Sequence, residues 1–264
     1  MTAQGYLFDQ AWTLERTRLA GLEAALDAGT RGHLTRLGTA PGSRCLEVGA
    51  GGGTVARWLA GRVAPGGSIV AADAHTGFLE AWDDQPPGLE ILRHDIAAAD
   101  LPTGGFDLVY ARWLVHWLPD KRRGLRRMAA ALRPGGVLLV EEPDFVTAFH
   151  GCEPPALRRV LTAGMRHLQA SSPGDAEYGR RLPDELSAVG LTGVEAEGRC
   201  PVARGGTPPA AGFLRLTLEK LRRPLLEGGL VTEAEFEDAL APLGDPRVTV
   251  LMPMTVAAWG RRPE

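Results

Sequence analysis

Five short apolar runs, separated by segments with helical spacing, constrain the fold of this chain most strongly. They cover residues 44–48, 68–73, 89–95, 106–110 and 137–140. Continuous apolar runs of this length are typical of parallel strands that are buried on both faces. The alternation of such runs with helices predicts an α/β fold, a doubly wound and mostly parallel sheet with helices on both sides.

The segments around this core extend it at both ends. Leu19, Leu22 and Leu26 share one face of a helix expected over residues 11–29, with Gly29 as a plausible end. Further helices are expected around residues 119–132, 157–168, 182–189, 214–225 and from 231 onward, with strands over 194–202 and 248–259. Since 264 residues are many for one domain and few for two, we expect one domain with an added helical cap.

A glycine-rich loop, GAGGG at residues 49–53, follows the first apolar run. Ligands of doubly wound sheets bind at the carboxyl ends of the strands, where a glycine-rich turn lets the backbone approach closely. Asp73 ends the second run, 20 residues after Gly53. That spacing suits a carboxylate that accepts hydrogen bonds from ribose hydroxyls, and nicotinamide-dependent enzymes show it as well.

Three details distinguish a cationic nucleoside ligand from a dinucleotide. Thr54 occupies the position where the dinucleotide fingerprint requires a third glycine. Glu47 precedes the first glycine, where a carboxylate suits a cation and repels a pyrophosphate. Asp95 ends the third run and is placed to accept from an exocyclic amine such as that of adenine. A ligand with an amine, a ribose and an adenine, but no phosphate, satisfies all three.

These residues carry a resemblance to a known family. The segment LEVGAGGG (46–53) resembles the first motif of class I S-adenosylmethionine-dependent methyltransferases. The segments VAAD (70–73), HDI (94–96), FDLV (106–109) and LRPGG (132–136) resemble their later motifs, in the same order. The resemblance covers roughly residues 40–145. The segments WTLER (12–16) and AWGRR (258–262) are similar to those of a bacterial subgroup.

The resemblance implies a seven-stranded, Rossmann-like methyltransferase fold in three parts. Residues 1–40 would form N-terminal helices that cover the cofactor site, and residues 41–145 the core that binds S-adenosylmethionine. Residues 146–264 would complete the sheet and supply helical cap insertions.

The resemblance also implies which residues hold the cofactor. The loop residues Glu47, Gly49, Ala50, Gly51 and Gly53 would hold the methionine end. Asp73, with Ala74 beside it, would bind the ribose. Asp95 would take the adenine amine, with the Ile96 amide on the ring, and Arg112 and Trp113 would lie near the sulfonium. The alternatives are a helix cap or turn role for Asp73 and Asp95, and a salt bridge to the N-terminal helix for Glu47.

The acceptor side is less constrained. Methyl transfer is a direct displacement that depends on alignment, with a base needed if the acceptor is a phenol, an acidic carbon or an amine. We expect His116 and Asp144 to be the catalytic residues, with His150 and Tyr178 as weaker candidates. The alternatives are a buried histidine satisfied by backbone for His116, and a capping carboxylate for Asp144. Trp113 and Trp117 could wall the methyl group or simply pack in the core.

Composition excludes other partners. The net charge of -3 excludes the strongly basic surface of a typical nucleic-acid binder, and no apolar stretch approaches the roughly 18 residues of a membrane span. The basic run at 121–127 is expected to be a solvated helix face. The first ten residues lack the order of a signal peptide, and the three cysteines form no CxxC pair, which fits a reducing cytoplasm.

The fourth strand ends without an acid, at Arg112, so we also expect no metal. The function that fits best is methyl transfer from S-adenosylmethionine to a small-molecule acceptor in bacterial secondary metabolism. Three alternatives remain at this stage: an S-adenosylmethionine-binding protein with other chemistry such as a cyclisation, an RNA or protein methyltransferase, and a nicotinamide oxidoreductase.

Overall fold

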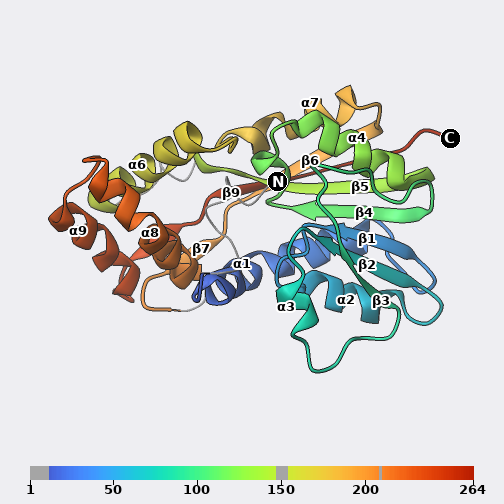
Figure 1. The fold of residues 1–264 in the computed structure, drawn as a ribbon, viewed down its shortest axis with the longest axis horizontal. Coiled ribbons are helices and arrows are strands. Elements are labelled where there is room, and N and C mark those ends of the chain that lie inside the picture. The colour runs from blue at the N-terminus through green and yellow to red at the C-terminus, as the bar shows by residue number, and fades with distance from the viewer. Residues whose placement is uncertain (1–11, 147–153, 208–209) are drawn as a thin grey trace.

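A seven-stranded sheet forms the centre of the molecule, in the order β3-β2-β1-β4-β5-β9-β6 (Figure 1). The computed structural model describes residues 12–146, 154–207 and 210–264. The strands of this sheet are β1 (Arg44–Val48), β2 (Ser68–Asp73), β3 (Leu89–Arg93), β4 (Phe106–Arg112), β5 (Leu132–Asp144), β6 (Thr192–Arg199) and β9 (Met254–Arg261). The first five are parallel, and β9 runs antiparallel between β5 and β6. This arrangement confirms the predicted fold class.

Helices cover both faces of the sheet and form a cap at one end. They are α1 (Glu15–Arg36), α2 (Thr54–Val63), α3 (Gly77–Glu80), the 3-10 helix η1 (Val115–Trp117), α4 (Lys121–Ala131), α6 (Pro155–Ser171), α7 (Tyr178–Ala188), α8 (Ala210–Glu227) and α9 (Glu233–Gly244). In Figure 1, α6, α8 and α9 gather at one end of the molecule, and α1 lies between them and the sheet. None of the described helices is long and apolar enough to cross a membrane.

Alternate residues of a central strand are buried on opposite faces. Leu46 and Val48 of β1 join one apolar cluster, whereas Cys45 joins a second cluster that includes Val55 and Leu59 of α2. A strand with helices on both sides has no solvent-facing side chains, which explains its unbroken apolar sequence. A third cluster holds the cap together and includes residues of α1, α6, α8 and α9.

Two segments break where a single strand was expected. The predicted strand over 194–202 divides into β6 and β7 (Val202–Arg204), and that over 248–259 into β8 (Thr249–Leu251) and β9. Pro201 and Pro253 lie at the breaks, and proline has no N–H to donate to a sheet ladder. β7 and β8 pair with each other in a separate two-stranded antiparallel sheet.

The N-terminal helix is longer than predicted. α1 continues past Gly29 to Arg36. Beyond Gly29, the buried side chains of Thr30 and His33 hydrogen-bond to Glu141 of β5, which keeps this part of the helix on the sheet. Tertiary contacts therefore outweigh the low helix propensity of one glycine.

Candidate active site

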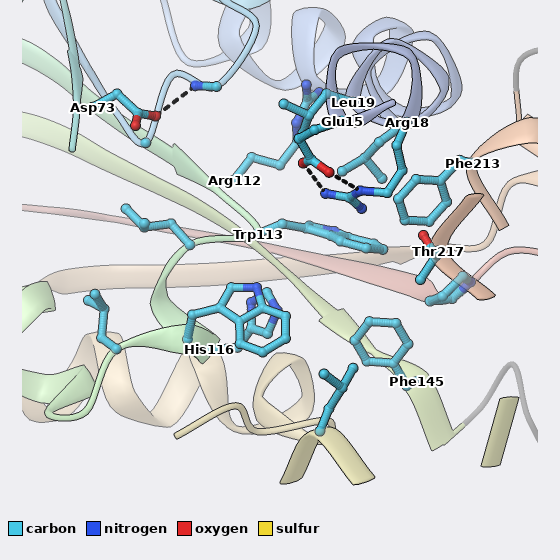
Figure 2. A pocket seen from close by; sticks show the side chains of 18 of the residues that line it. Glu15, Arg18, Leu19, Asp73, Arg112, Trp113, His116, Phe145, Phe213 and Thr217 are labelled. Atoms are coloured by element: carbon cyan, nitrogen blue, oxygen red, sulfur yellow. Dashed lines mark hydrogen bonds and ion pairs between the residues drawn. The ribbon is translucent and has the colours of Figure 1, made fainter. Parts of the chain in front are cut away.

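One cavity lies at the carboxyl ends of β1, β2, β3 and β4, between α1, α6 and α8 (Figure 2). Its volume is about 240 Å³, far more than a few water molecules need. One end of it is formed by residues of the strand ends and the loops after them, namely Gly49, Gly51, Asp73, Ala74, Asp95 and Ile96. The other end is lined mainly by apolar side chains of the cap. The cavity therefore lies at the carboxyl ends of the strands, where the topology predicts a ligand.

The glycine loop is shaped by its backbone angles. The N–H groups of Gly49 and Ala50 both donate to the carbonyl oxygen of Ala72, at 2.8 and 3.2 Å. Gly51 has φ +57°, in the left-handed region that favours glycine. Gly53 caps α2 at φ +79°, and a Cβ there would lie 2.3 Å from the ring of Trp82. Gly53 is absent from the cavity lining, as is Ala50, so both shape the loop from behind.

Asp73 supports the loop and faces the cavity. Its two carboxylate oxygens accept from the N–H groups of Gly51 and His75, at 2.9 and 2.8 Å. Burial raises the pKa of Asp73, and these hydrogen bonds partly offset that effect. Because each carboxylate oxygen has two lone pairs, Asp73 can still accept from a ligand.

Asp95 lines the same end of the cavity. Its Oδ1 accepts from the N–H of Ala97 at 2.9 Å. The turn role that the sequence left open is therefore present.

Glu47 is buried behind the cavity wall and is absent from the lining. Its Oε2 has no hydrogen-bond partner among the described residues. Burial raises the pKa of Glu47 to about 8, while Arg112 opposes this shift and Asp27 and Glu23 add to it. Within the described chain, Glu47 forms no salt bridge to α1, which was the alternative expectation.

Helix α1 also covers the glycine loop. Arg16 pairs with Glu23 at 2.9 Å, and a Cβ added to Gly52 would lie 2.2 Å from Glu23 Oε1. The ion pair of α1 thus lies directly on the backbone of the loop, and a larger residue at position 52 would have to displace it.

A buried polar network connects Arg112 to α1 and β5. Arg112 donates to Thr30 Oγ1 at 2.9 Å and to Asp27 at 3.0 Å. Thr30 in turn donates to Glu141, whose other oxygen lies 2.7 Å from His33 Nδ1. Burial lowers the pKa of His33, but its contacts with Glu141 and Glu197 outweigh this, and the net shift is upward. Arg112 lines the cavity as a side chain fixed by this network.

Trp113 forms the floor between the two ends of the cavity (Figure 2). It is the one non-glycine residue of the described chain with a positive φ, at +53°. Its Nε1 donates to Thr255 Oγ1 at 3.1 Å, and its ring meets Phe145 and Phe213 edge-on at centroid distances of 5.5 and 5.8 Å. A bulky residue in this conformation costs roughly 1–3 kcal/mol, so the surroundings hold the indole in place.

His116 follows Trp113 in η1, and its buried ring lines the cavity. Its Nδ1 lies 2.6 Å from Oε2 of Glu142, a buried residue of β5. Its Nε2 is also buried and has no partner among the described residues. The ring is therefore held by a carboxylate, which differs from the alternative of a histidine satisfied by backbone.

Two other predicted acceptor-side residues, Asp144 and Tyr178, do not reach the cavity. Asp144 is buried in β5 and forms a two-point ion pair with Arg180, at 2.9 and 3.0 Å. The expectation that it faces the acceptor is not supported, because Asp144 and Tyr178 are both absent from the lining. Burial and the nearby Glu142 raise the pKa of Tyr178. His150 lies outside the described residues.

The apolar end holds polar groups that the sequence did not single out. Arg18 and Glu15 of α1 form a two-point ion pair at 2.7 and 2.8 Å, with only 5% and 1% of their side chains exposed. The guanidinium lies over the ring of Phe213, 5.4 Å from its centroid. Thr217 of α8 points its hydroxyl into the same end, and Oγ1 has no partner within the described segments. Glu15 belongs to the WTLER segment, so that motif was the available signal.

Comparison with known proteins identifies the family. Residues 46–140 match the family model described as "Methyltransferase domain". This segment contains the strands and loops of the cofactor end and is similar to class I S-adenosylmethionine-dependent methyltransferase domains. This similarity favours S-adenosylmethionine over the nicotinamide dinucleotide that the glycine loop alone allowed. Among the described residues, no group of three or more His, Cys, Asp or Glu side chains is arranged to hold a metal ion.

Individual relatives agree with the family. The chain is 28% identical over 177 residues to methyltransferase str2 of Strobilurus tenacellus, covering 66% of this chain and 62% of the relative. It is 33% identical over 169 residues to the trans-aconitate 2-methyltransferase of Deinococcus radiodurans, covering 58% and 61%. The chain therefore spans about three fifths of the length of these relatives.

A solved structure shares the fold. Phosphoethanolamine N-methyltransferase 2 of Haemonchus contortus, in complex with phosphomonomethylethanolamine and S-adenosylhomocysteine, aligns with a TM-score of 0.63 and 15% identity. The alignment covers 100% of this chain and 61% of that one. At this identity, the likeness concerns the fold alone.

Proposed function

We propose that this protein transfers a methyl group from S-adenosylmethionine to a small-molecule acceptor. The observation that carries the proposal is the single cavity in which the strand-end carboxylates and the apolar cap meet, at Trp113 and His116. A donor bound along the strand ends would place its reactive group next to the apolar end.

The residues at the strand ends fit the donor. Asp73 and Asp95 offer acceptor oxygens in the cavity, and the loop backbone leaves room beside Gly49 and Gly51. Behind this end of the cavity, Oε2 of the buried Glu47 has no partner among the described residues, and a carboxyl group in this place does not favour a pyrophosphate. When bound, S-adenosylmethionine supplies a methyl group on a positively charged sulfur.

The residues of this chain then align the donor with the acceptor and exclude water from the cavity. Helix α1, within the predicted cover of residues 1–40, and helix α8 of the cap wall the acceptor end. The rigid Trp113 separates the two ends, and Arg112 is fixed beside it. Holding two reactants in register can contribute up to ~7–11 kcal/mol to lowering the barrier. His116 is placed to act as the base.

A small-molecule acceptor is supported by the enclosed apolar end and by a relative whose name specifies trans-aconitate as substrate. The net charge of -3 argues against RNA. A reducing cytoplasm remains our prediction for its location.

Calorimetry with S-adenosylhomocysteine and, separately, with NAD tests the proposal. We expect binding of S-adenosylhomocysteine and none of NAD. Binding of NAD without S-adenosylhomocysteine would overturn it.

A further inference from the structure

The contact between Glu142 and His116 determines which ring nitrogen of His116 carries the proton. Glu142 Oε1 accepts from the N–H groups of Leu114 and Val115, at 3.1 and 2.7 Å. Its Oε2 lies 2.6 Å from His116 Nδ1 and 3.3 Å from the backbone nitrogen of the same residue. The carboxylate is thus fixed by main-chain donors that are independent of the ring.

An ionised carboxylate can only accept hydrogen bonds, so the proton of a neutral His116 belongs on Nδ1. Nε2 is then the nitrogen with a free lone pair. It is buried, belongs to a cavity-lining residue and has no partner in the described ranges. An unpartnered ring nitrogen on a residue that lines a ligand site can act as a general base when the acceptor comes within hydrogen-bond reach.

Other charged and aromatic groups surround the His116–Glu142 pair, and none of those described hydrogen-bonds to Nε2 of His116. Lys121 of α4 donates to the carbonyl oxygens of Leu118 and Pro173, and Tyr178 of α7 is near Glu142. The Asp175 N–H donates to the His116 carbonyl, and its carboxylate accepts from Glu177 N–H and Arg181. Aromatic rings of Trp113, Trp117 and Phe145 complete the surroundings of the imidazole.

The rest of the chamber indicates the kind of acceptor. Its walls carry aliphatic and aromatic side chains, among them Leu161, Met165, Phe213 and Leu221. Glu15, the acid of the described lining at the apolar end, is engaged at both oxygens by Arg18 and is not open to pair with an ammonium group. A carboxylate acceptor is already ionised near neutral pH, needs no base, and would lose its hydration among these walls.

We propose that the acceptor is an apolar, ring-bearing molecule with a weakly acidic hydroxyl group, that Nε2 of His116 removes the proton of this hydroxyl, and that Glu142 is the positioning residue that holds His116 in the required tautomer. This inference rests on the proposed function. It adds the chemistry of the acceptor and a role for Glu142.

The step balances without a further reactant. The hydroxyl oxygen of the acceptor forms a bond to the methyl carbon while the bond from that carbon to sulfur breaks, and its electron pair remains on sulfur. The hydroxyl proton passes to Nε2, and the carboxylate of Glu142 compensates the charge of the imidazolium. His116 later releases this proton to water. Thr217 Oγ1 offers a second hydrogen bond to a polar group of the acceptor.

The first test reads the tautomer directly. Nitrogen NMR of the protein labelled at histidine should show His116 with its proton on Nδ1. In E142Q, the amide oxygen should stay on the N–H groups of Leu114 and Val115, which turns the amide NH₂ toward Nδ1 and moves the proton to Nε2. A wild-type ring protonated on Nε2 would overturn the inference, whether or not the variant folds.

The second test uses matched acceptors of two sizes. The probes are 1-naphthol, 1-naphthylamine and 1-naphthoic acid, and the biphenyl compounds with the same three groups, each incubated with methyl-deuterated donor. We expect mass-labelled ether from a hydroxyl probe only. Methylation of an amine or acid probe instead, or of none by protein that still binds S-adenosylhomocysteine, would refute the inference and leave the proposed cofactor site standing.

With the hydroxyl probe, E142Q should lower kcat by ~10²–10⁴-fold with little change in KM, since a wrong tautomer removes the base and leaves binding intact. The rise of kcat with pH should also disappear. The control is D107N: the wild-type Asp107 carboxylate accepts from the Arg44 N–H at 2.7 Å and lies at the amino end of β4, away from the cavity. If both variants lost kcat equally, or if E142Q kept the wild-type pH profile, Glu142 would have only a structural role and the inference would be wrong.

Discussion

Removal of the Asp73 carboxylate is the most direct test of the cofactor end. In Asp73→Ala, the N–H groups of Gly51 and His75 lose their acceptors, and a bound ribose loses its own. Hydrogen bonds to a charged group contribute about 1.5–3 kcal/mol each. If the equivalent of one such bond is lost, the Kd for S-adenosylhomocysteine should rise roughly 10- to 150-fold.

Calorimetric titration of the wild type, Asp73→Ala and Asp73→Asn measures this effect, with thermal unfolding recorded in parallel. Asp107→Ala is the matched control, because Asp107 also accepts a backbone N–H, that of Arg44, but lies at the amino ends of the strands. It should lower stability and leave the Kd unchanged. An Asp73→Ala protein that folds and keeps the wild-type Kd would refute the ribose role.

Two further predictions concern buried charge. Because burial raises the pKa of Glu47 from 4.5 to about 8, the folded protein keeps a proton that the unfolded chain loses, and stability falls as the pH rises between these values. Glu47→Gln should therefore be more stable than the wild type above pH 8, by up to about 5 kcal/mol, and similar near pH 4.5, as measured by urea unfolding; parallel stability curves would contradict this. Glu15→Gln should cost about 3–5 kcal/mol in the same assay, because Arg18 loses its buried carboxylate. The double variant Glu15→Leu/Arg18→Met should cost much less, and equal losses would show that the pair is not coupled.

Local sequence was sufficient for the strands and the loop. A strand buried on both faces needs a continuous apolar run, and the alternating glycines of 49–53 reflect backbone angles set within the loop itself. The carboxylates of Asp73 and Asp95 could be placed because the end of a parallel strand defines its position relative to neighbouring strands.

Contacts between distant elements could not be predicted in this way. Glu141 and Glu142 are adjacent in sequence, yet the two-residue period of β5 directs them to opposite faces, one toward α1 and the other toward His116. Asp144, which follows the fifth apolar run, was predicted to be catalytic. It lies on the same face of β5 as Glu142 but two residues further along, where it pairs with Arg180. Which acid reaches the histidine depends on how η1 and α7 pack, and no local pattern encodes that.

The position of α1 has a consequence for redesign. Its first two turns carry both the Arg16–Glu23 pair above the glycine loop and the Glu15–Arg18 pair in the acceptor chamber. Substitutions in this helix that are chosen for a new acceptor would therefore also change the affinity for the methyl donor. Helix α8 faces the chamber through Phe213, Thr217 and Leu221, away from the glycine loop. Substitutions in α8 should therefore change the preferred acceptor without changing the affinity for the methyl donor.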